Sequence, residues 1–258
     1  MKIATWNVGT MRGRSSEIVE TITRRNIDLC CVQEVRWRGA STRYLTGKDS
    51  RYKFFWKGND QGTNGVGVLL AVKWVDKLYD IKRVSDRIML VKLLVGDSIL
   101  TVLSVYAPQT GLAELVKEEF YDNLQTVISN LPENEIVMPC GDFNGHVGKE
   151  SAGYKGVHGV SGYGYEMQTV IEFWISQSQK KVKVDSILMR KRHLKLIKAI
   201  KVIPSQGCVK QHKLMICTIQ FWELLKSLLT STEETCGKPH KRDQKRVEVD
   251  NEISAVIA

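Results

Sequence analysis

Short apolar runs rich in β-branched and aromatic residues recur along the chain, and they constrain its fold more than any other feature. Turn residues close each run, which is typical of β-strands. Two longer segments, Ser15–Arg25 and Leu112–Leu131, instead place apolar residues at helical spacing. Strands interleaved with helices, together with hairpin-like pairs, predict an α/β fold of mixed sheets with helices outside them. The expected strands are Ile3–Trp6, Leu29–Gln33, Gly65–Val72, Arg87–Leu94, Ile99–Tyr106, Ile136–Cys140, Val184–Met189 and Lys213–Ile219.

Each expected helix has one apolar face. In the first helix, Ile18, Val19 and Ile22 share a face. Because amphipathic helices bury their apolar side against the core, both faces are predicted to pack on a sheet. In the second helix the apolar positions are Leu115, Val116, Phe120, Leu124, Val127 and Ile128.

The chain of 258 residues carries a net charge of +10 at neutral pH, which favours a polyanionic partner. Nucleic acid is the first candidate and an anionic membrane surface the second, while simple solubility would also explain the charge. Hydrophobic residues make up 43% of the chain, enough for a substantial core. No apolar run approaches the roughly 20 residues of a membrane helix. Strand-like sequence begins at Lys2, so no signal peptide is expected.

Six cysteines are present, but their placement does not indicate a disulfide framework. Cys30 and Cys31 are adjacent in one apolar run, and Cys140 and Cys217 lie in two others. No CxxC pair of the kind that binds zinc occurs. We therefore expect buried, reduced thiols in an intracellular protein.

Composition divides the chain into a long folded part and a short polar tail. Residues 1–222 hold all the expected strands and helices, and also a long loop rich in glycine and tyrosine from Gly148 to Tyr165. After Leu225 the sequence turns polar and includes "KPHKRDQKR" at Lys238–Arg246. Residues 223–258 are predicted to be a disordered tail.

Polar side chains stand at the ends of four expected strands, where α/β folds assemble ligand sites. These residues are Asn7, Glu34, Tyr106 and the pair Asp142 and Asn144. The pair belongs to the segment "GDFNGHVG", which follows an apolar run. Because side chains alternate along a strand, Asp142 and Asn144 are expected on one side and Phe143 on the other, packed inward.

Each of these residues also has an ordinary structural explanation. Glu34 could pair with Arg36 or Arg38 as a solvated residue, and Asn7 could form a turn before Gly9. The "DFN" segment could form a common Asx-type turn followed by glycine. The four strand ends carry more weight as a set than one by one.

The motifs at these ends, taken in order, resemble those of a known superfamily. "TWNVGT", "CVQEVRW", "LSVYAPQ" and "GDFNGHVG" are similar to the four leading motifs of the endonuclease/exonuclease/phosphatase superfamily. "KVDSIL" and "VKQHKLMI" resemble its last two, the Asp and His segments. The resemblance covers Met1 to Ile219 and extends to the endonuclease domains of non-LTR retrotransposons. It implies the DNase I-like fold, in which two packed mixed β-sheets are flanked by helices in four layers.

The resemblance implies a metal site at Glu34, Asn7 and Asp142. Glu34 matches the metal-binding carboxylate of the family, and Asn7 would orient Asp142 and the metal shell. Mg²⁺ suits such a site because it keeps most of its waters and needs only one or two protein carboxylates. Mn²⁺ is expected to substitute for it, and no small-molecule cofactor is expected.

The same resemblance implies catalytic roles for residues around that metal. Asp142 and Asn144 would position and activate the attacking water, and Tyr106 would reach the phosphate or the leaving oxygen. Asp185 would hold the imidazole of His212 in one tautomer. His212 would then contact the phosphate or act in general acid–base catalysis. Without the resemblance, Asp185 and His212 are equally well explained as surface residues.

Duplex DNA is the expected partner, in a nuclear protein that does not bind membranes. The stretch Lys180–Lys213 is strongly basic, and Asp185 is its one acidic residue. We interpret it as a face beside the active site that follows the phosphate backbone. The residues expected to bind nucleic acid are Arg36, Arg190, Lys191 and Arg192.

Two departures from the family pattern bear on activity. Gln211 stands where the family usually has an Asp before the final His, which removes one negative charge from the metal site. Between Gly164 and Asp185 the chain lacks the room for a family helix, strand and aromatic loop, so one strand region is expected to be shortened. The alternatives to an active endonuclease are a catalytically weakened or inactive nucleic-acid-binding remnant, or a small-molecule or lipid phosphatase of the same superfamily.

Overall fold

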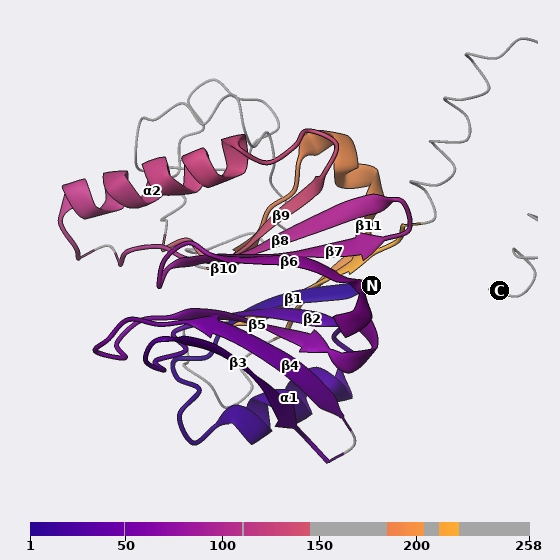
Figure 1. Ribbon diagram of the computed structural model, residues 1–258, viewed down its shortest axis with the longest axis horizontal. Coiled ribbons are helices and arrows are strands. Elements are labelled where there is room, and N and C mark those ends of the chain that lie inside the picture. The colour runs from indigo at the N-terminus through magenta and orange to yellow at the C-terminus, as the bar shows by residue number, and fades with distance from the viewer. Residues whose placement is uncertain (49, 110, 145–184, 204–211, 222–258) are drawn as a thin grey trace, which may run out of the picture. The chain divides into compact units, whose positions relative to one another are not determined.

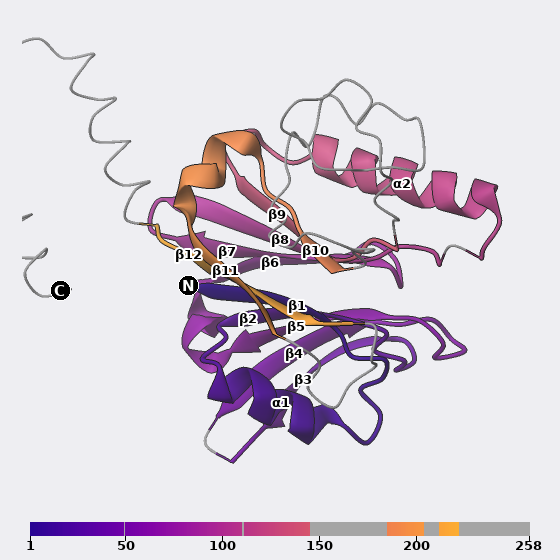
Figure 2. The ribbon, with the colours of Figure 1, turned by 180° about the vertical axis from the view of Figure 1, so that it is seen from behind.

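Two β-sheets pack face to face, and each carries one long helix on its outer surface (Figures 1 and 2). The computed structural model describes residues 1–48, 50–109, 111–144, 185–203 and 212–221. All but the last of these residues belong to one compact unit, Met1–Gln220. The order of layers is helix, sheet, sheet, helix, which confirms the predicted four-layer α/β sandwich.

The larger sheet has seven strands and contains the N-terminal strand near its middle. β1 and β2 run parallel, and the other neighbouring pairs run antiparallel. In order across the sheet the strands are β11 (Ile197–Ile203), β12 (Leu214–Ile219), β1 (Lys2–Asn7), β2 (Leu29–Gln33), β5 (Val66–Ala71), β4 (Arg51–Lys57) and β3 (Ala40–Thr46).

The smaller sheet has five strands and is also mixed. β8 and β9 run parallel, with Tyr106 in register with Asp142. Because the chain direction is shared within a parallel pair, both strands of the pair end at the same edge of the sheet. In order across the sheet the strands are β10 (Asp185–Ile187), β9 (Ile136–Asp142), β8 (Ser98–Tyr106), β7 (Ile88–Val95) and β6 (Leu78–Arg83).

The central strands are buried on both faces, which explains why they read as continuous apolar runs. In β2, every residue is buried. Cys30 and Val32 pack toward α1 (Ser15–Arg24), while the Cys31 thiol approaches the Leu103 carbonyl of the other sheet at 3.8 Å. Across the same interface the Gln33 amide donates to Ser104 Oγ at 3.3 Å. Successive side chains of β2 therefore point to opposite faces of the sheet and pack into two separate cores.

Helix α1 confirms its predicted apolar face, because Ile18, Val19 and Ile22 are buried in the cluster beneath the larger sheet. Helix α2 (Glu114–Ser129) packs Phe120, Leu124 and Ile128 on the smaller sheet, as its pattern predicts. No helix within the described parts of the chain has the length and apolar character needed to span a membrane.

The predicted apolar face of α2 is wrong at its start. Leu115 is 73% exposed and Val116 is 41% exposed, whereas Lys117 is buried. With about 3.6 residues per turn, Leu115 lies on the side of the helix opposite to Phe120 and Leu124. The aliphatic stem of Lys117 can cover apolar surface, while its ammonium group lies 3.5 Å from Glu114 Oε2.

Four strands escaped the sequence prediction, and three of them are sheet edges. β3, β6 and β11 each have a neighbour on one side only, and most of their residues are not buried. An edge strand needs no strict apolar pattern, since water satisfies its outer face and outer backbone. The fourth, β4, reads "RYKFFWK" and does carry the aromatic signal of a strand.

The cysteines in described parts of the chain are buried and free, as predicted: Cys30, Cys31, Cys140 and Cys217. Burial raises the pKa of the Cys217 thiol to about 12, and it raises the pKa of Cys30 and Cys31 well above the usual range. These thiols therefore stay protonated and behave as small apolar side chains.

A buried ion pair ties three strands together at the end of the smaller sheet where β9 begins. Lys92 Nζ of β7 lies 2.5 Å from Glu135 Oε1, and Thr101 Oγ1 of β8 donates to Glu135 Oε2 at 2.5 Å. The Lys92 and Glu135 side chains are 9% and 4% exposed. Both carboxylate oxygens are thus occupied in a site from which water is largely excluded.

Glu135→Ala should lower the free energy of unfolding by about 3–5 kcal/mol, because it leaves the Lys92 charge buried without its partner. Urea denaturation followed by circular dichroism measures this loss. Glu133→Ala is the matched control, since that side chain is 94% exposed and lies 3.8 Å from Arg192, and it should change stability little. Equal effects of the two variants would contradict a structural role for the buried pair.

Candidate active site

The amide of Asn7 joins three acidic or basic side chains from different parts of the chain. Its Nδ2 lies 3.0 Å from Glu34 Oε1, 2.8 Å from Asp142 Oδ2 and 3.3 Å from His212 Nε2. Its Oδ1 accepts the Gly9 N–H at 3.0 Å, which fixes the amide with its NH₂ group toward this cluster. Two N–H bonds face three partners, so at least one N–H is shared.

The strand arrangement explains why these side chains meet. Asn7 ends β1 beside Gln33 of the parallel strand β2, and Glu34 follows immediately. Tyr106 ends β8 beside Asp142 of the parallel strand β9. The two parallel pairs lie in facing sheets and end on the same side, at the left of Figure 1. We call this edge of the sandwich the rim.

Glu34 has an unusual backbone conformation. Its φ is +55°, and that of Arg36 is +54°, a left-handed region that is costly for residues other than glycine. Hydrogen bonds impose this shape, since the N–H groups of Val35 and Arg36 donate to the carbonyls of Gly65 and Asn64 at 3.0 Å each. The bend turns the Glu34 carboxylate toward Asn7, and Arg36 Nη2 meets its second oxygen at 2.5 Å.

Asp142 is buried and held on both of its oxygens. Oδ1 accepts the N–H of Asn144 at 3.0 Å, and Oδ2 faces Asn7. β9 ends at Asp142, and Asn144 lies beyond it with a φ of +45°. The side-chain amide of Asn144 donates to the Ala107 carbonyl at 2.8 Å. The segment is therefore the Asx-type turn that the sequence also allowed.

The expectation that strand alternation presents Asp142 and Asn144 together is wrong, because the strand ends before Asn144. Phe143 does pack inward, against the apolar cluster beneath α2. Tyr121 of α2 donates its hydroxyl to the Phe143 carbonyl at 3.0 Å, which anchors the turn. Asn144 thus supports the position of Asp142 through the main chain.

Tyr106 lies at the rim as predicted, with 4% of its surface exposed. Burial, followed by the negative charges of Glu34 and Asp142, raises the pKa of Tyr106 to about 12. The phenol therefore keeps its proton at neutral pH and can donate a hydrogen bond. Gln109 approaches the hydroxyl at 3.5 Å, and the Arg87 guanidinium lies 5.0 Å from the ring centre.

His212 enters the rim from the chain just before β12, the antiparallel neighbour of β1. The ring is buried, and its Nδ1 lies 3.8 Å from Asp142 Oδ2. Asp185 was expected to hold this imidazole. Its main chain pairs in register with Asp142, while its side chain lies outside the described part of the structure. The structure therefore brings together Asn7, Glu34, Tyr106, Asp142 and His212, it places Asn144 in the turn that holds Asp142, and it places the backbone of Asp185 beside them.

The residues at the rim fit a hard divalent cation. Among the described residues no three His, Cys, Asp or Glu side chains surround a common point. Two buried carboxylates, Glu34 and Asp142, instead meet at a single amide nitrogen. Adjacent buried carboxylates repel each other, and a cation relieves that repulsion. A hard cation such as Mg²⁺ needs few protein ligands, so the Glu34 and Asp142 carboxylates suffice for it, while the NH₂ group of Asn7 holds them in place and cannot itself be a ligand.

The predicted position beside the active site is wrong for the part of the basic segment that runs from Arg190 through Leu196. Arg190 donates to the carbonyls of Pro132 at 2.9 Å, Glu133 at 3.0 Å and Leu131 at 3.3 Å. These carbonyls precede the start of β9, whereas the rim is at its end. The short 3₁₀ helix η2 (Lys191–Leu196), which includes Arg192, lies at that far end too, at the upper right of Figure 1. The reason is that β10 runs antiparallel to β9 and leads the chain away from the rim.

Arg36, which was expected to bind nucleic acid, does lie near the rim, together with two arginines that were not predicted as binding residues, Arg12 and Arg38. Arg12 donates from Nε to the Arg36 carbonyl at 2.7 Å and from Nη2 to the Gly62 carbonyl at 3.4 Å. A Cβ at Gly62 would come within 2.4 Å of Arg12 Nη2 and 3.3 Å of Arg38 Cγ, so this glycine allows the arginines to gather. Arg12, Arg36 and Arg38 are all exposed. Their signal was present in "MRGR" and "EVRWRG", next to two of the motifs.

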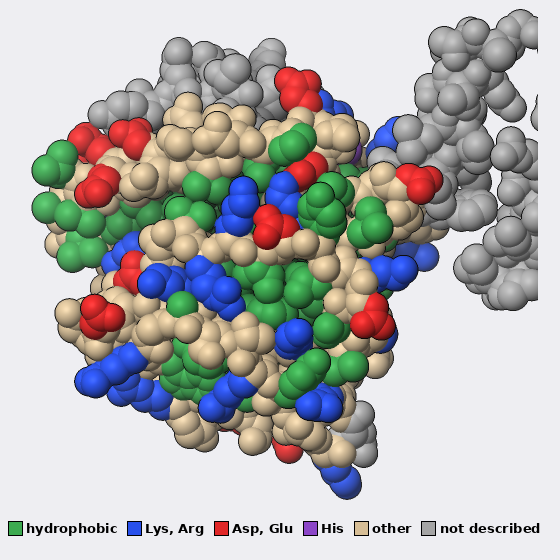
Figure 3. All heavy atoms as spheres, in the orientation of Figure 1, with side chains coloured by type: hydrophobic (Ala, Val, Ile, Leu, Met, Phe, Trp, Pro, Cys, Tyr) green, Lys and Arg blue, Asp and Glu red, His purple; other side chains and the backbone are tan. Residues whose placement is uncertain are grey.

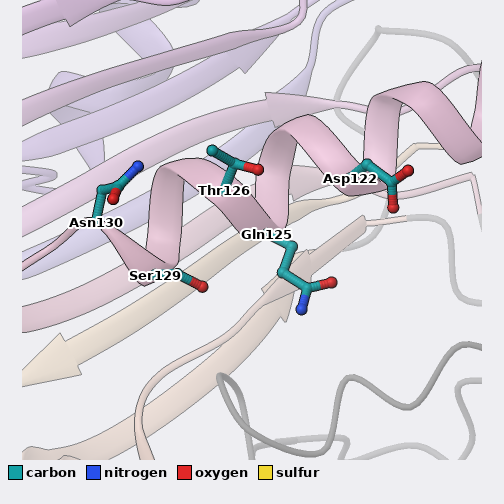
Figure 4. Close-up of a pocket in the computed structure, with 5 residues that line it drawn as sticks. All are labelled: Asp122, Gln125, Thr126, Ser129 and Asn130. Carbon is teal, nitrogen blue, oxygen red and sulfur yellow. The ribbon is translucent and has the colours of Figure 1, made fainter.

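Basic side chains gather on the side of the molecule where the rim lies (Figure 3), whereas a hollow on α2 lacks them. On the face shown in Figure 3, Lys and Arg side chains gather mostly at the left and along the lower part, with fewer acidic ones among them. A shallow polar hollow on α2 has one acidic and no basic side chain (Figure 4). It is lined by Asp122, Gln125, Thr126, Ser129 and Asn130.

Comparisons with solved structures support the same fold. The endonuclease domain of TRAS1, a telomere-specific non-LTR retrotransposon, aligns with a TM-score of 0.53 and 15% identity over 85% of this chain and 98% of that one. The 3′ phosphatase NExo from Neisseria, bound to product DNA hairpin, aligns with a TM-score of 0.57 and 14% identity over 85% of this chain and 99% of that one. At these identities the likeness shows the DNase I-like fold alone.

Sequence comparisons add a relative and a family. Craniofacial development protein 2 from Bos taurus is 25% identical over 241 residues, with 83% of this chain and 40% of the relative covered. The chain thus spans about two fifths of the length of that relative. The model of the Endonuclease/Exonuclease/phosphatase family matches residues 4–152, which include Asn7, Glu34, Tyr106 and Asp142. The chain therefore belongs to the endonuclease/exonuclease/phosphatase family.

Proposed function

We propose that this chain is a Mg²⁺-dependent phosphodiester hydrolase that nicks duplex DNA in the nucleus, in the manner of a retrotransposon-derived endonuclease. The observation that carries the proposal is the meeting of Glu34, Asp142 and His212 at the amide of Asn7. This set combines two carboxylates for a cation, an imidazole and a fixed amide at one buried point. Members of the family hydrolyse phosphodiester bonds, and this composition matches what that reaction requires.

Glu34 and Asp142 would hold the metal ion, and Asn7, expected as a third ligand, would orient them through its NH₂ group. When bound, the ion would supply positive charge that stabilises the charge developing at the phosphate in the transition state. Glu34 faces the rim from β2, and its bent backbone limits its freedom to move away. Asn7 keeps both carboxylates in place, because its own orientation is fixed by the Gly9 N–H.

The remaining rim residues would handle protons and the phosphate oxygens. Asp142, with Oδ1 held by the turn at Asn144, can accept a proton from an attacking water at Oδ2. The protonated phenol of Tyr106 can donate to a phosphate or leaving oxygen. The His212 imidazole, whose Nδ1 lies 3.8 Å from Asp142 Oδ2 and whose Nε2 faces Asn7, would contact the phosphate or act in general acid–base catalysis.

DNA is the favoured substrate because the exposed arginines near the rim and the overall charge both suit a polyanion. The net charge is +10, Arg36 pairs with Glu34, and Arg12 and Arg38 lie near Arg36 around Gly62. Contacts of arginine with phosphate carry no base information, so binding should be nearly independent of sequence. One structural neighbour was solved with a DNA hairpin bound.

Nicking of a supercoiled plasmid in Mg²⁺, absent in EDTA, is the expected result for the wild-type chain. Glu34→Gln keeps the shape of the side chain but removes a ligand charge, so nicking at limiting Mg²⁺ should fall about 10²-fold or more. Glu133→Gln, an exposed change at the far end of the sandwich, should nick like wild type. If Glu34→Gln also nicks like wild type, the assigned metal site is incorrect.

The same assay separates the alternatives. Duplex binding without nicking would identify a catalytically inactive remnant, for which the segment between Gly164 and Asp185 and the residue Gln211 remain the expected causes. Both lie outside the described residues. Release of phosphate from an inositol phosphate, without nicking of DNA, would identify a small-molecule phosphatase.

His212→Ala should lower the rate of nicking about 10²–10⁴-fold with little change in duplex affinity, since the imidazole acts at the reacting phosphate. Single-turnover cleavage and fluorescence anisotropy on the same duplex measure the two quantities. A parallel loss of binding and cleavage would mean that His212 holds the fold or the substrate instead.

Arg12→Gln combined with Arg38→Gln should flatten the dependence of duplex affinity on salt. Each lost phosphate contact should reduce the slope of log affinity against log salt by about 0.9. The matched control is Arg192→Gln with Lys195→Gln, two exposed residues of η2 at the far end. A flatter slope in the control, with none in the rim variant, would place the DNA on the other end of the protein.

A further inference from the structure

We propose that Arg36 is an internal counter-ion of Glu34. When a divalent cation binds to the Glu34 carboxylate, the Arg36 guanidinium leaves it and contacts a phosphate group of the substrate. The inference rests on the proposed function and deepens it. It makes Arg36 the residue that couples cation binding to polyanion binding, in addition to its expected contact with nucleic acid.

The contacts of Glu34 show how the carboxylate is shared. Oε1 accepts from the buried amide of Asn7 at 3.0 Å, and Oε2 lies 2.5 Å from Arg36 Nη2. The first partner is neutral and fixed, whereas the second is a cation. Arg36 therefore supplies the positive charge that two adjacent carboxylates, Glu34 and Asp142, require at the rim.

The two partners of this ion pair differ in exposure. The side chain of Arg36 is 47% exposed, and that of Glu34 is 10% exposed. Glu34 cannot leave the rim without a large change of the fold, but the guanidinium can turn into solvent. The guanidinium occupies Glu34 Oε2 as a cation, so a divalent cation competes with it for the same carboxylate.

The main chain of Arg36 is fixed while its side chain is free to turn. Its N–H donates to the Asn64 carbonyl at 3.0 Å, and its carbonyl accepts from Arg12 Nε at 2.7 Å. Behind this loop, a Cβ at Gly58 would come within 1.8 Å of the Trp37 carbonyl oxygen, so the backbones are in close contact. The left-handed conformations of Glu34 and Arg36 are thus held from both sides. A displaced guanidinium consequently stays at the mouth of the site.

The displaced guanidinium has an obvious acceptor in the substrate. Its planar set of N–H donors matches phosphate oxygens, and it can bind them in a bidentate manner. A cation at Glu34 would repel Arg36 and release it for that contact. Because linkage is reciprocal, a cation should raise the affinity for a phosphate backbone by the same factor as the backbone raises the affinity for the cation.

Manganese binding to the DNA-free protein tests the first half of the proposal. Mn²⁺ titrations followed by electron paramagnetic resonance should show affinity roughly fivefold higher in Arg36→Gln than in wild type, because a competing half-exposed ion pair is removed. Arg38→Gln is the matched control, since it removes the same charge from an exposed residue two positions further along the loop. It should raise Mn²⁺ affinity clearly less. Equal gains in the two variants, or weaker binding in Arg36→Gln, would overturn the inference.

Duplex binding tests the second half. In a His212→Ala background, where cleavage is slow, Mn²⁺ should raise the affinity for a short duplex about fivefold, and Arg36→Gln should abolish that gain. Arg38→Gln should weaken the duplex with and without Mn²⁺ by the same factor. A gain that survives in Arg36→Gln would overturn the coupling.

Failure of the inference and failure of the proposed function give different results. If neither wild type nor Arg36→Gln binds Mn²⁺, the proposed metal role fails and the inference fails with it. If both bind Mn²⁺ with the same affinity and wild type nicks DNA, the inference alone is overturned. Unchanged circular dichroism of Arg36→Gln shows that the fold is not the cause.

Discussion

One amide holds together two carboxylates that belong to different sheets. Asn7 Nδ2 lies within hydrogen-bond distance of Glu34 on the larger sheet and of Asp142 on the smaller sheet. Two buried negative charges so near to each other are unfavourable unless donors and a cation compensate them. Asn7 supplies the donors, the Gly9 N–H keeps it oriented, and Arg36 supplies a positive charge. The chemistry of the rim depends on this arrangement.

The fold serves that arrangement through two parallel strand pairs placed in otherwise antiparallel sheets. β1 with β2 and β8 with β9 deliver Asn7, Glu34, Tyr106 and Asp142 to one edge. The unfavourable backbone conformations that this arrangement requires are confined to a few residues. Glu34, Arg36 and Asn144 adopt left-handed backbones, and neighbouring carbonyls at Gly65, Asn64 and Ala107 stabilise them. Strain of this kind is typical of functional sites, where the surrounding structure holds a residue in an uncommon conformation.

Positive charge has two distinct uses in this protein. At the far end, Arg190 caps the carbonyls that follow α2, and Lys92 lies in a buried pair with Glu135, so both side chains stabilise the fold. At the rim, Arg12, Arg36 and Arg38 are exposed and lie around Gly62. Net charge alone cannot separate these uses, because the same side chain serves either purpose according to what it contacts.

The sequence by itself determined most of the central strands, both helices and four of the rim residues. β2 was predicted at its observed bounds because a strand buried on both faces reads as an apolar run. Polar residues at the ends of such runs made four rim residues stand out, namely Asn7, Glu34, Tyr106 and Asp142. The tertiary structure alone decided the edge strands β3, β6 and β11, whose weak patterns become strands only when a neighbour provides hydrogen bonds. It also decided that Arg190 faces carbonyls far from the rim, and that Arg36 reaches Glu34. Charge and spacing are local properties of a sequence, whereas the partner of a charged side chain depends on which distant segments the fold brings to it.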